Sequence, residues 1–294
     1  MRDRVAGQPR QVWLFDGQAA TRIGVTNPEG GAGTYFRAEP GEDFSDCIRR
    51  QTAWLDPEVA EGRFHAMNLG PAEYYPRIAR PNVLGARDQL WSPSFKAEEV
   101  YIKNSRSQRT LLARKLETIC QTVQPCEETL DVYGHEIRNL LILAATEAEM
   151  HWRGVLVANG SLAQRFNSNE YFKLIEPLKL TEYAVTFHDF PDLQPIRPFA
   201  GWSKDDPTES LGWYDAYHAV KHNRDAEFQR GTLRSTFEAV SACMALLVAQ
   251  FGPVSLNTEL SSWVGLASPD WAIGEMYIPE VTSDVFSPVS HPGL

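Results

Sequence analysis

Two histidines four residues apart, His218 and His222, form the pair in this sequence best suited to proton transfer. They lie in the stretch WYDAYHAVKHNR, and Asp215 stands three residues before His218. Side chains three or four residues apart meet on a helix surface, so the three groups are expected to share one face. A neutral imidazole has a pKa of about 6.5, which suits proton transfer, and a neighbouring carboxylate would orient it. The same histidines could instead bind a metal ion or lie on a solvated face without a task.

Cationic residues gather around this pair, in a chain that is acidic overall. The sequence has 28 Lys and Arg against 38 Asp and Glu, for a formal net charge of −10. The overall field therefore does not attract nucleic acid, and a phosphate must be bound by a local cationic patch. We expect that patch to consist of Lys221, His222, Arg224, Arg230 and Arg234, with Lys221, Arg230 and Arg234 as the RNA-binding residues.

Arg224 also falls in line with the apolar side of the same predicted helix, which carries Trp213, Tyr217 and Val220. A charge buried there without a partner is costly, so a carboxylate is needed beside it. Glu147, on the flank of an apolar helix upstream, is the expected partner. The Glu147–Arg224 pair would then be a structural ion pair that joins two helices.

Glu147 and His151 allow a second interpretation, in which they combine with His218 and His222 in a di-metal four-helix bundle. Their spacing is Glu-x-x-x-His, whereas that bundle motif is Glu-x-x-His, and His151 falls inside an apolar stripe typical of a core residue. The four cysteines form neither a disulfide framework nor a zinc pair. The phosphate-binding loop and the GxGxxG, GxSxG and HExxH motifs are missing. We therefore expect no metal and no cofactor.

Four amphipathic helices are expected to position these residues. Apolar residues at helical spacing, bounded by Pro and Gly, predict helices over about 105–124, 125–159, 207–224 and 226–251. Several prolines keep most of residues 161–205 out of helix, so this segment is expected to be an extended cross-over. Residues 104–252 are thus predicted to form a four-helix bundle.

The ends of the chain have a different character. Residues 1–103 contain short apolar segments between Gly and Pro residues, which favours strands and loops, and residues 253–294 return to a similar composition. The expected fold class is α+β, with a β-rich N-terminal region, the bundle and a C-terminal extension. No apolar run is long enough to span a membrane and the N-terminus lacks a signal-peptide pattern, so we expect a cytoplasmic protein without a membrane partner.

The stretch WYDAYHAVKHNRDAEF, the long apolar helix after it and the upstream HEIRNLLILAATEAEMHWRGVLVANG together resemble bacterial proteins related to HEPN domains. The resemblance covers about residues 125–252. HEPN domains are bundles of four to five helices, common in toxin and phage-defence systems. Active members are metal-independent ribonucleases, usually dimeric, with an Arg-polar-x3–5-His motif. His222 matches the motif histidine, whereas Tyr217 or His218 occupies the place of the motif arginine.

The resemblance implies a defence or toxin protein that cleaves RNA without a metal ion and forms a homodimer. His222 would be the general acid or base at the ribose 2′-OH, with His218 and Asp215 assisting. The phosphorane charge would be stabilised by Arg224, Arg138 or Lys221. The alternative is a non-catalytic protein that binds RNA or a protein partner, the latter through the N-terminal region acting as a sensor.

Overall fold

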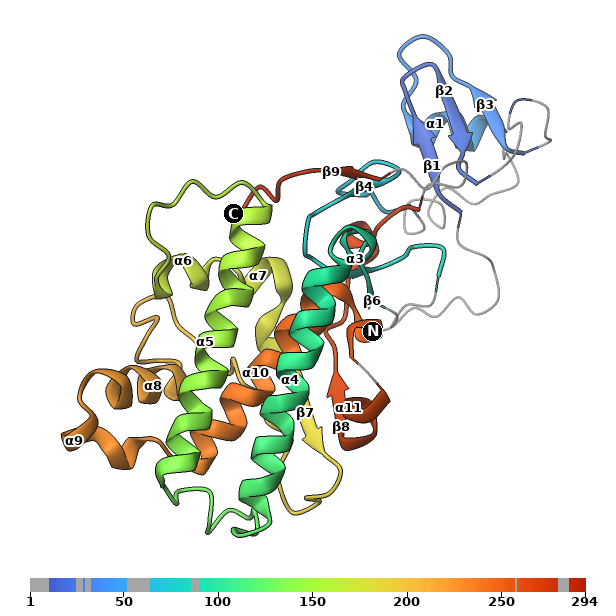
Figure 1. The fold of residues 1–294 in the computed structure, drawn as a ribbon. Coiled ribbons are helices and arrows are strands. Elements are labelled where there is room, and N and C mark those ends of the chain that lie inside the picture. The colour runs from blue at the N-terminus through green and yellow to red at the C-terminus, as the bar shows by residue number, and fades with distance from the viewer. Residues whose placement is uncertain are drawn as a thin grey trace. The chain divides into compact units, whose positions relative to one another are not determined.

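The structure is a computed structural model of the 294-residue chain. It describes residues 11–24, 29, 33–51, 64–85, 90–256, 258–279 and 286–294, without the side chains of Arg224, Thr258 and Leu260. The chain divides into two units. The first unit is Met1–Tyr74, Arg80–Arg87 and Trp271–Ser287, and the second, which we call the helical unit, is Tyr75–Ala79, Asp88–Asp270 and Pro288–Leu294. Figure 1 labels their elements.

The first unit contains a three-stranded antiparallel sheet in the order β1-β2-β3. Its strands are β1 (Trp13–Phe15), β2 (Ala19–Arg22) and β3 (Tyr35–Arg37), and Ala20 lies opposite both Phe15 and Phe36. One helix, α1 (Phe44–Gln51), covers this sheet by burying Cys47 and Ile48 against Ala20. The remaining short elements of this unit are β4 (Glu73–Tyr74), β5 (Arg80–Pro81) and η5 (Ile273–Glu275).

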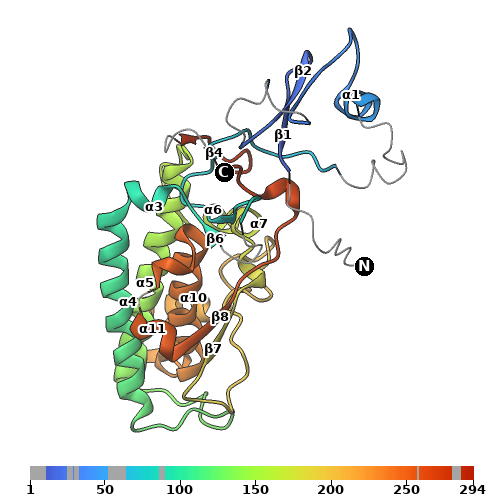
Figure 2. The ribbon, with the colours of Figure 1, turned by 90° about the vertical axis from the view of Figure 1, so that its right-hand side faces the viewer.

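Four long helices form the core of the helical unit. They are α4 (Glu99–Cys120), α5 (His135–Ala158), α8 (Gly212–His222) and α10 (Leu233–Phe251). α10 is apolar on almost every side and contacts the other three helices, and Figure 2 shows α4, α5 and α10 side by side. A helix that is apolar all round must be buried on all sides, which explains its central position.

A strand pair and several short helices complete the helical unit. β7 (Ala184–Phe187) pairs antiparallel with β8 (Val264–Ala267), and the ring of Phe187 lies 4.9 Å from that of Phe237 in α10. The other elements are β6 (Leu90–Trp91), α3 (Ser94–Ala97), α6 (Ser168–Phe172), α7 (Ile175–Leu178), η2 (Leu180–Glu182), α9 (Arg224–Glu227), η3 (Phe228–Arg230), η4 (Pro253–Ser255) and α11 (Thr258–Trp263), while β9 (Ser287–Pro288) spans the division between the units.

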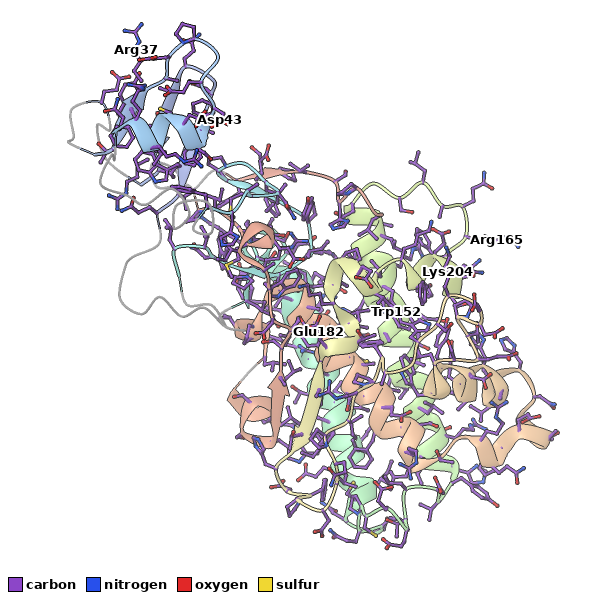
Figure 3. All side chains as sticks on the ribbon, turned by 180° about the vertical axis from the view of Figure 1, so that it is seen from behind. Arg37, Asp43, Trp152, Arg165, Glu182 and Lys204 are labelled. Carbon is purple, nitrogen blue, oxygen red and sulfur yellow. The ribbon has the colours of Figure 1, made fainter. Side chains whose placement is uncertain are left out.

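An aromatic cluster around Trp152 of α5, labelled in Figure 3, holds α8 in place. The indole of Trp152 is fully buried, and its ring lies 5.8 Å from that of Trp213 and 5.4 Å from that of Tyr214. The indole of Trp213 also donates a hydrogen bond of 2.7 Å to the carbonyl of Pro198 in the cross-over. Large buried aromatic rings contribute much of the packing energy of a core, so α8 is fixed rigidly on its apolar side.

The predicted α+β class and four-helix core are confirmed, but the helix boundaries differ. The second helix begins at His135 instead of Pro125, because Thr129 forms a turn: its hydroxyl accepts a hydrogen bond from the Cys126 amide and donates one to the Gln124 carbonyl. The fourth begins at Leu233 rather than near residue 226, where the Thr232 hydroxyl accepts from the Ser235 amide as a helix cap. No helix of the described residues combines the length and apolar character needed to cross a bilayer.

Candidate functional site: the imidazole face of α8

The structure brings His218 and His222 together on one side of α8. Their rings stack with centroids 5.8 Å apart and an interplanar angle of 17°. The opposite side of the helix is buried and carries Trp213, Tyr217 and Val220. The two imidazoles therefore lie on the side of α8 that faces away from the core. His222 is exposed and His218 is half-buried. We call this surface, with Lys221 at its edge, the imidazole face.

Asp215 shares the helix with the histidines but is engaged elsewhere. Its carboxylate forms an ion pair with the guanidinium of Arg230, which also lies 3.7 Å from Glu227. Among the residues that the structure describes, no hydrogen bond joins a carboxylate to His218 or His222. No hydrogen bond among the described residues therefore supports the predicted orienting role of Asp215. The charge of Arg230 is neutralised by the carboxylates of Asp215 and Glu227.

A polar network that was not predicted connects α8 to α5. The hydroxyl of Tyr214 donates a hydrogen bond of 2.7 Å to Glu149, and the hydroxyl of Tyr217 lies 3.4 Å from the other oxygen of this carboxylate. The ammonium of Lys221 donates a bond of 2.6 Å to the Tyr217 hydroxyl. The network therefore holds Lys221 on Tyr217, whose ring lies 5.1 Å from that of His218.

The electrostatics of the face follow from burial and from this network. Partial burial lowers the pKa of His218 below 6.5, which favours the neutral imidazole at neutral pH. The hydrogen bond to Tyr217 raises the pKa of Lys221, which stays a cation. Burial, strengthened by the Glu149 carboxylate, raises the pKa of Tyr214, which remains a hydrogen-bond donor. A neutral imidazole next to a fixed ammonium can accept a proton while the ammonium binds an anion.

The other predicted pair, Glu147 and His151, lies inside the helical unit. His151 is fully buried, with Nδ1 at 2.9 Å from the Tyr101 hydroxyl and 3.0 Å from Nε2 of Gln250. Its Nε2 is 3.5 Å from Glu147. Burial lowers the pKa of His151 to about 3, helped by the nearby Arg109 guanidinium, so this histidine is a neutral core residue.

No group of three or more His, Cys, Asp or Glu side chains in the described ranges is arranged to hold a metal ion. The di-metal interpretation required Glu147 and His151 to meet His218 and His222, and the structure places the two pairs in different surroundings. Glu147 lies within the bundle near His151 and Arg109, whereas His218 stacks on His222 and lies edge to face 4.6 Å from the ring of Tyr214.

The remaining predicted cations are placed as follows. Arg234 is held by Glu127 at 3.1 Å and Asp131 at 3.3 Å, so its charge is neutralised. Arg138 packs near Phe228, and its Nε and Nη1 are buried without a hydrogen-bond partner in the described part of the chain. The side chain of Arg224 lies outside the described residues, so its predicted ion pair with Glu147 stays a prediction.

Sequence reasoning missed Glu149, which is the carboxylate that joins α5 to α8. Glu147 lies closer to the apolar stripe, but its neighbours are His151 on the same helix and Arg109 of α4. The signal available in the sequence was the i, i+3 spacing of Tyr214 and Tyr217 on the apolar side of α8. Two buried tyrosine hydroxyls need a hydrogen-bond acceptor on the helix that faces them.

Comparison with known proteins adds no constraint: no family model, no curated protein and no solved structure matches this chain. The fold and the site thus define an α+β protein whose helical unit presents two stacked imidazoles and a fixed ammonium.

Proposed function

We propose that the helical unit is a HEPN-like RNA-binding domain of the bacterial defence or toxin type that cleaves RNA at the imidazole face without a metal ion. One observation carries this proposal: the stacked rings of His218 and His222 lie next to Tyr217, whose hydroxyl holds the ammonium of Lys221. Two proton-transfer groups and one cation are the side chains that transesterification at a phosphodiester requires.

The proposed reaction is an attack of the ribose 2′-oxygen on the adjacent phosphorus. His218, which burial keeps neutral, accepts the proton of the 2′-OH. The bond between phosphorus and the 5′-oxygen breaks, and His222 gives a proton to this leaving oxygen. Lys221 stabilises the charge that develops on the phosphorane. The products are a 2′,3′-cyclic phosphate and a 5′-hydroxyl, and a final proton exchange with water restores both imidazoles.

The experiment is incubation of wild-type protein and His222→Ala with total RNA in the presence of a chelator, followed by mapping of the fragment ends. The proposal expects 2′,3′-cyclic phosphate ends that form with the wild type and are lost in the variant. Because His222 is exposed, its replacement should leave the fold intact, as a circular dichroism melt would verify. RNA left intact by the wild type under all activating conditions would refute the cleavage proposal.

A non-catalytic function, binding RNA or a protein partner through the same face, is the second candidate. It is favoured by the engagement of Asp215 with Arg230, which leaves both imidazoles without an orienting carboxylate among the described residues. In this case His222→Ala would weaken complex formation, and no fragments would appear with either protein.

A further inference from the structure

A second group of side chains lies just beyond the end of α8 and is not used by the imidazole face. Phe228 of η3 follows His222 by six residues. Its ring lies 5.9 Å from that of Tyr133 at 87° and 4.9 Å from that of His135 at 47°. Tyr133 is 54% exposed, and His135 is exposed as well. We call these three rings, with Arg138, the Phe228 platform.

Arg138 gives the platform a positive charge. Its guanidinium carbon lies 5.9 Å from the centre of the Phe228 ring, and its Nη2 donates to Asn139 at 3.1 Å. Its Nε and Nη1 have no hydrogen-bond partner within the described residues. Since these two nitrogens are buried, Nη2, whose bond to Asn139 is exposed, is the atom of Arg138 that a phosphate oxygen can reach.

The platform is held rigidly by the backbone on both sides. Tyr133 and Thr232 form an antiparallel bridge, the Leu233 amide donates to the Val132 carbonyl at 2.9 Å, and the Arg234 amide donates to the Leu130 carbonyl at 2.7 Å. These bonds attach the segment that contains Tyr133 to the residues that directly follow η3. Rings that are already in place cost little conformational entropy when a ligand stacks on them.

The platform is also connected to α8, the helix that carries the imidazole face. Arg230, at the end of η3, forms the ion pair with Asp215 of α8. Gly231 lets the platform pack closely against the buried side of α8: a Cβ there would lie 3.2 Å from Cγ of Arg138 and 3.3 Å from Cγ1 of Val220. Six residues of chain span at most about 20 Å, so the platform lies within the length of a few extended nucleotides of His222.

We infer that the Phe228 platform stacks an unpaired base of single-stranded RNA whose backbone continues to the imidazole face. This inference rests on the function proposed above and specifies its substrate. Proteins that bind single strands combine aromatic rings, on which any base can stack, with cations that contact the backbone. The bases of a duplex are already stacked on one another, so the platform selects single strands over duplexes.

The test measures the affinity of a fluorescein-labelled RNA of about ten nucleotides, a length within the usual site size. Its riboses are 2′-O-methylated, so that it cannot be cleaved. Fluorescence anisotropy compares the wild type with Tyr133→Ala and Phe228→Leu, and with Leu111→Ala, an exposed apolar truncation on α4 that serves as the matched control. Stacking of one base corresponds to a loss of affinity of roughly 5- to 150-fold for Tyr133→Ala, while Leu111→Ala should bind as the wild type does.

A second readout isolates stacking from folding effects. A series of the same RNA with one abasic nucleotide at each position should contain one position that weakens wild-type binding as much as Tyr133→Ala does. At that position the protein variant and the abasic site should not be additive, because both remove the same contact. Additive losses, or equal binding of single-stranded and duplex RNA, would overturn the inference.

The outcomes separate this inference from the proposed function. Cleavage by the wild type combined with unchanged binding by Tyr133→Ala would refute the platform and leave the catalytic proposal standing. Weakened, non-additive binding by Tyr133→Ala without cleavage by any protein would support the platform and refute catalysis. A wild type that binds no single-stranded RNA would refute both.

Discussion

At the scale of single residues, the surroundings decide what a histidine does. His151 is fully buried between Tyr101, Gln250 and Glu147 and is kept neutral by burial. His218 is half-buried, and His222 lies in water. The same side chain is thus a core residue in α5 and a proton-transfer candidate in α8.

The burial of His151 predicts a stability that depends on pH. Its pKa is about 3 when folded and about 6.5 when unfolded, so the unfolded chain binds an extra proton between these values. The free energy of unfolding should therefore fall as pH drops below about 6.5, by roughly 2 kcal/mol at pH 5. Urea unfolding of the wild type and His151→Gln between pH 5 and 7.5 tests this, and the variant should lose less stability over that range.

The groups that face His151 include Glu147, whose pKa is raised by burial and which acts in the opposite direction. Arg109 and Tyr101, two further neighbours, keep their protons throughout that range of pH, and Arg77 also acts on His151 through its charge. Since all four are present in both proteins, the difference between them isolates His151. Parallel curves for the wild type and the variant would contradict the neutral buried imidazole.

At the scale of elements, the position of α8 against α5 depends on aromatic packing and on Glu149. The buried rings of Trp213 and Tyr214 pack on Trp152, and the hydroxyl of Tyr214 bonds to the carboxylate of Glu149. The imidazole face is therefore presented by a helix whose other side is fixed, which is the arrangement that a precise site requires.

Removal of the Tyr214 hydroxyl tests this connection. A hydrogen bond to a charged group contributes about 1.5–3 kcal/mol, so Tyr214→Phe should lower the free energy of unfolding by roughly that amount. Tyr133→Phe, which alters an exposed ring, is the matched control and should leave stability unchanged. Chemical denaturation measures both, and equal stability of Tyr214→Phe and the wild type would show that the bond to Glu149 is not a stabilising link.

The backbone conformation at the C-terminal end of α10 requires a glycine. Gly252 has a φ of +81°, and a Cβ there would lie 2.3 Å from the carbonyl oxygen of Leu90. Strain and the clash together predict that Gly252→Ala destabilises by about 1–3 kcal/mol or more. Gly212→Ala, at the start of α8 with open space around the new Cβ, should be neutral or slightly stabilising. Thermal melts that rank the two variants the other way would contradict this account of the helix end.

The elements were easier to predict from the sequence than the contacts between them. The four long helices follow from apolar residues at helical spacing, but Thr129 and Thr232 set the starts of α5 and α10 through local hydrogen bonds. The hydrogen bonds between the tyrosines of α8 and Glu149 depend on how α5 and α8 are rotated about their axes, which no local sequence pattern specifies. The ion pairs of Arg230 and Arg234 likewise join residues that only the tertiary fold brings together.

At the scale of the whole molecule, charge limits how RNA can be bound. The net charge of −10 repels a polyanion, and Arg230 and Arg234 are both engaged by carboxylates. Among the side chains that the structure describes in the proposed site, Lys221 and Arg138 are the cations left for phosphates. Binding must therefore depend on a few contacts and on stacking rather than on the overall field.

Salt dependence measures the number of these contacts. Each phosphate contact on a single strand contributes about −0.7 to the slope of log affinity against log salt, so two contacts predict a slope of about −1.4. Lys221→Met should reduce its magnitude by about 0.7, and Arg234→Met should leave it unchanged because that charge is paired. A loss of slope with Arg234→Met would show that its ion pairs open to bind RNA.

The central claim is that His222 does chemistry on RNA, and the rate of cleavage of one single-stranded RNA in the presence of a chelator tests it most directly. The comparison is between the wild type, His222→Ala and His188→Ala, which removes an exposed imidazole elsewhere in the helical unit. We predict that His222→Ala slows cleavage by about 10²–10⁴-fold, as expected for loss of a general acid or base, while His188→Ala cleaves as the wild type does. Equal rates for the wild type and His222→Ala, or fragments that disappear with the chelator, would contradict a metal-independent site on α8.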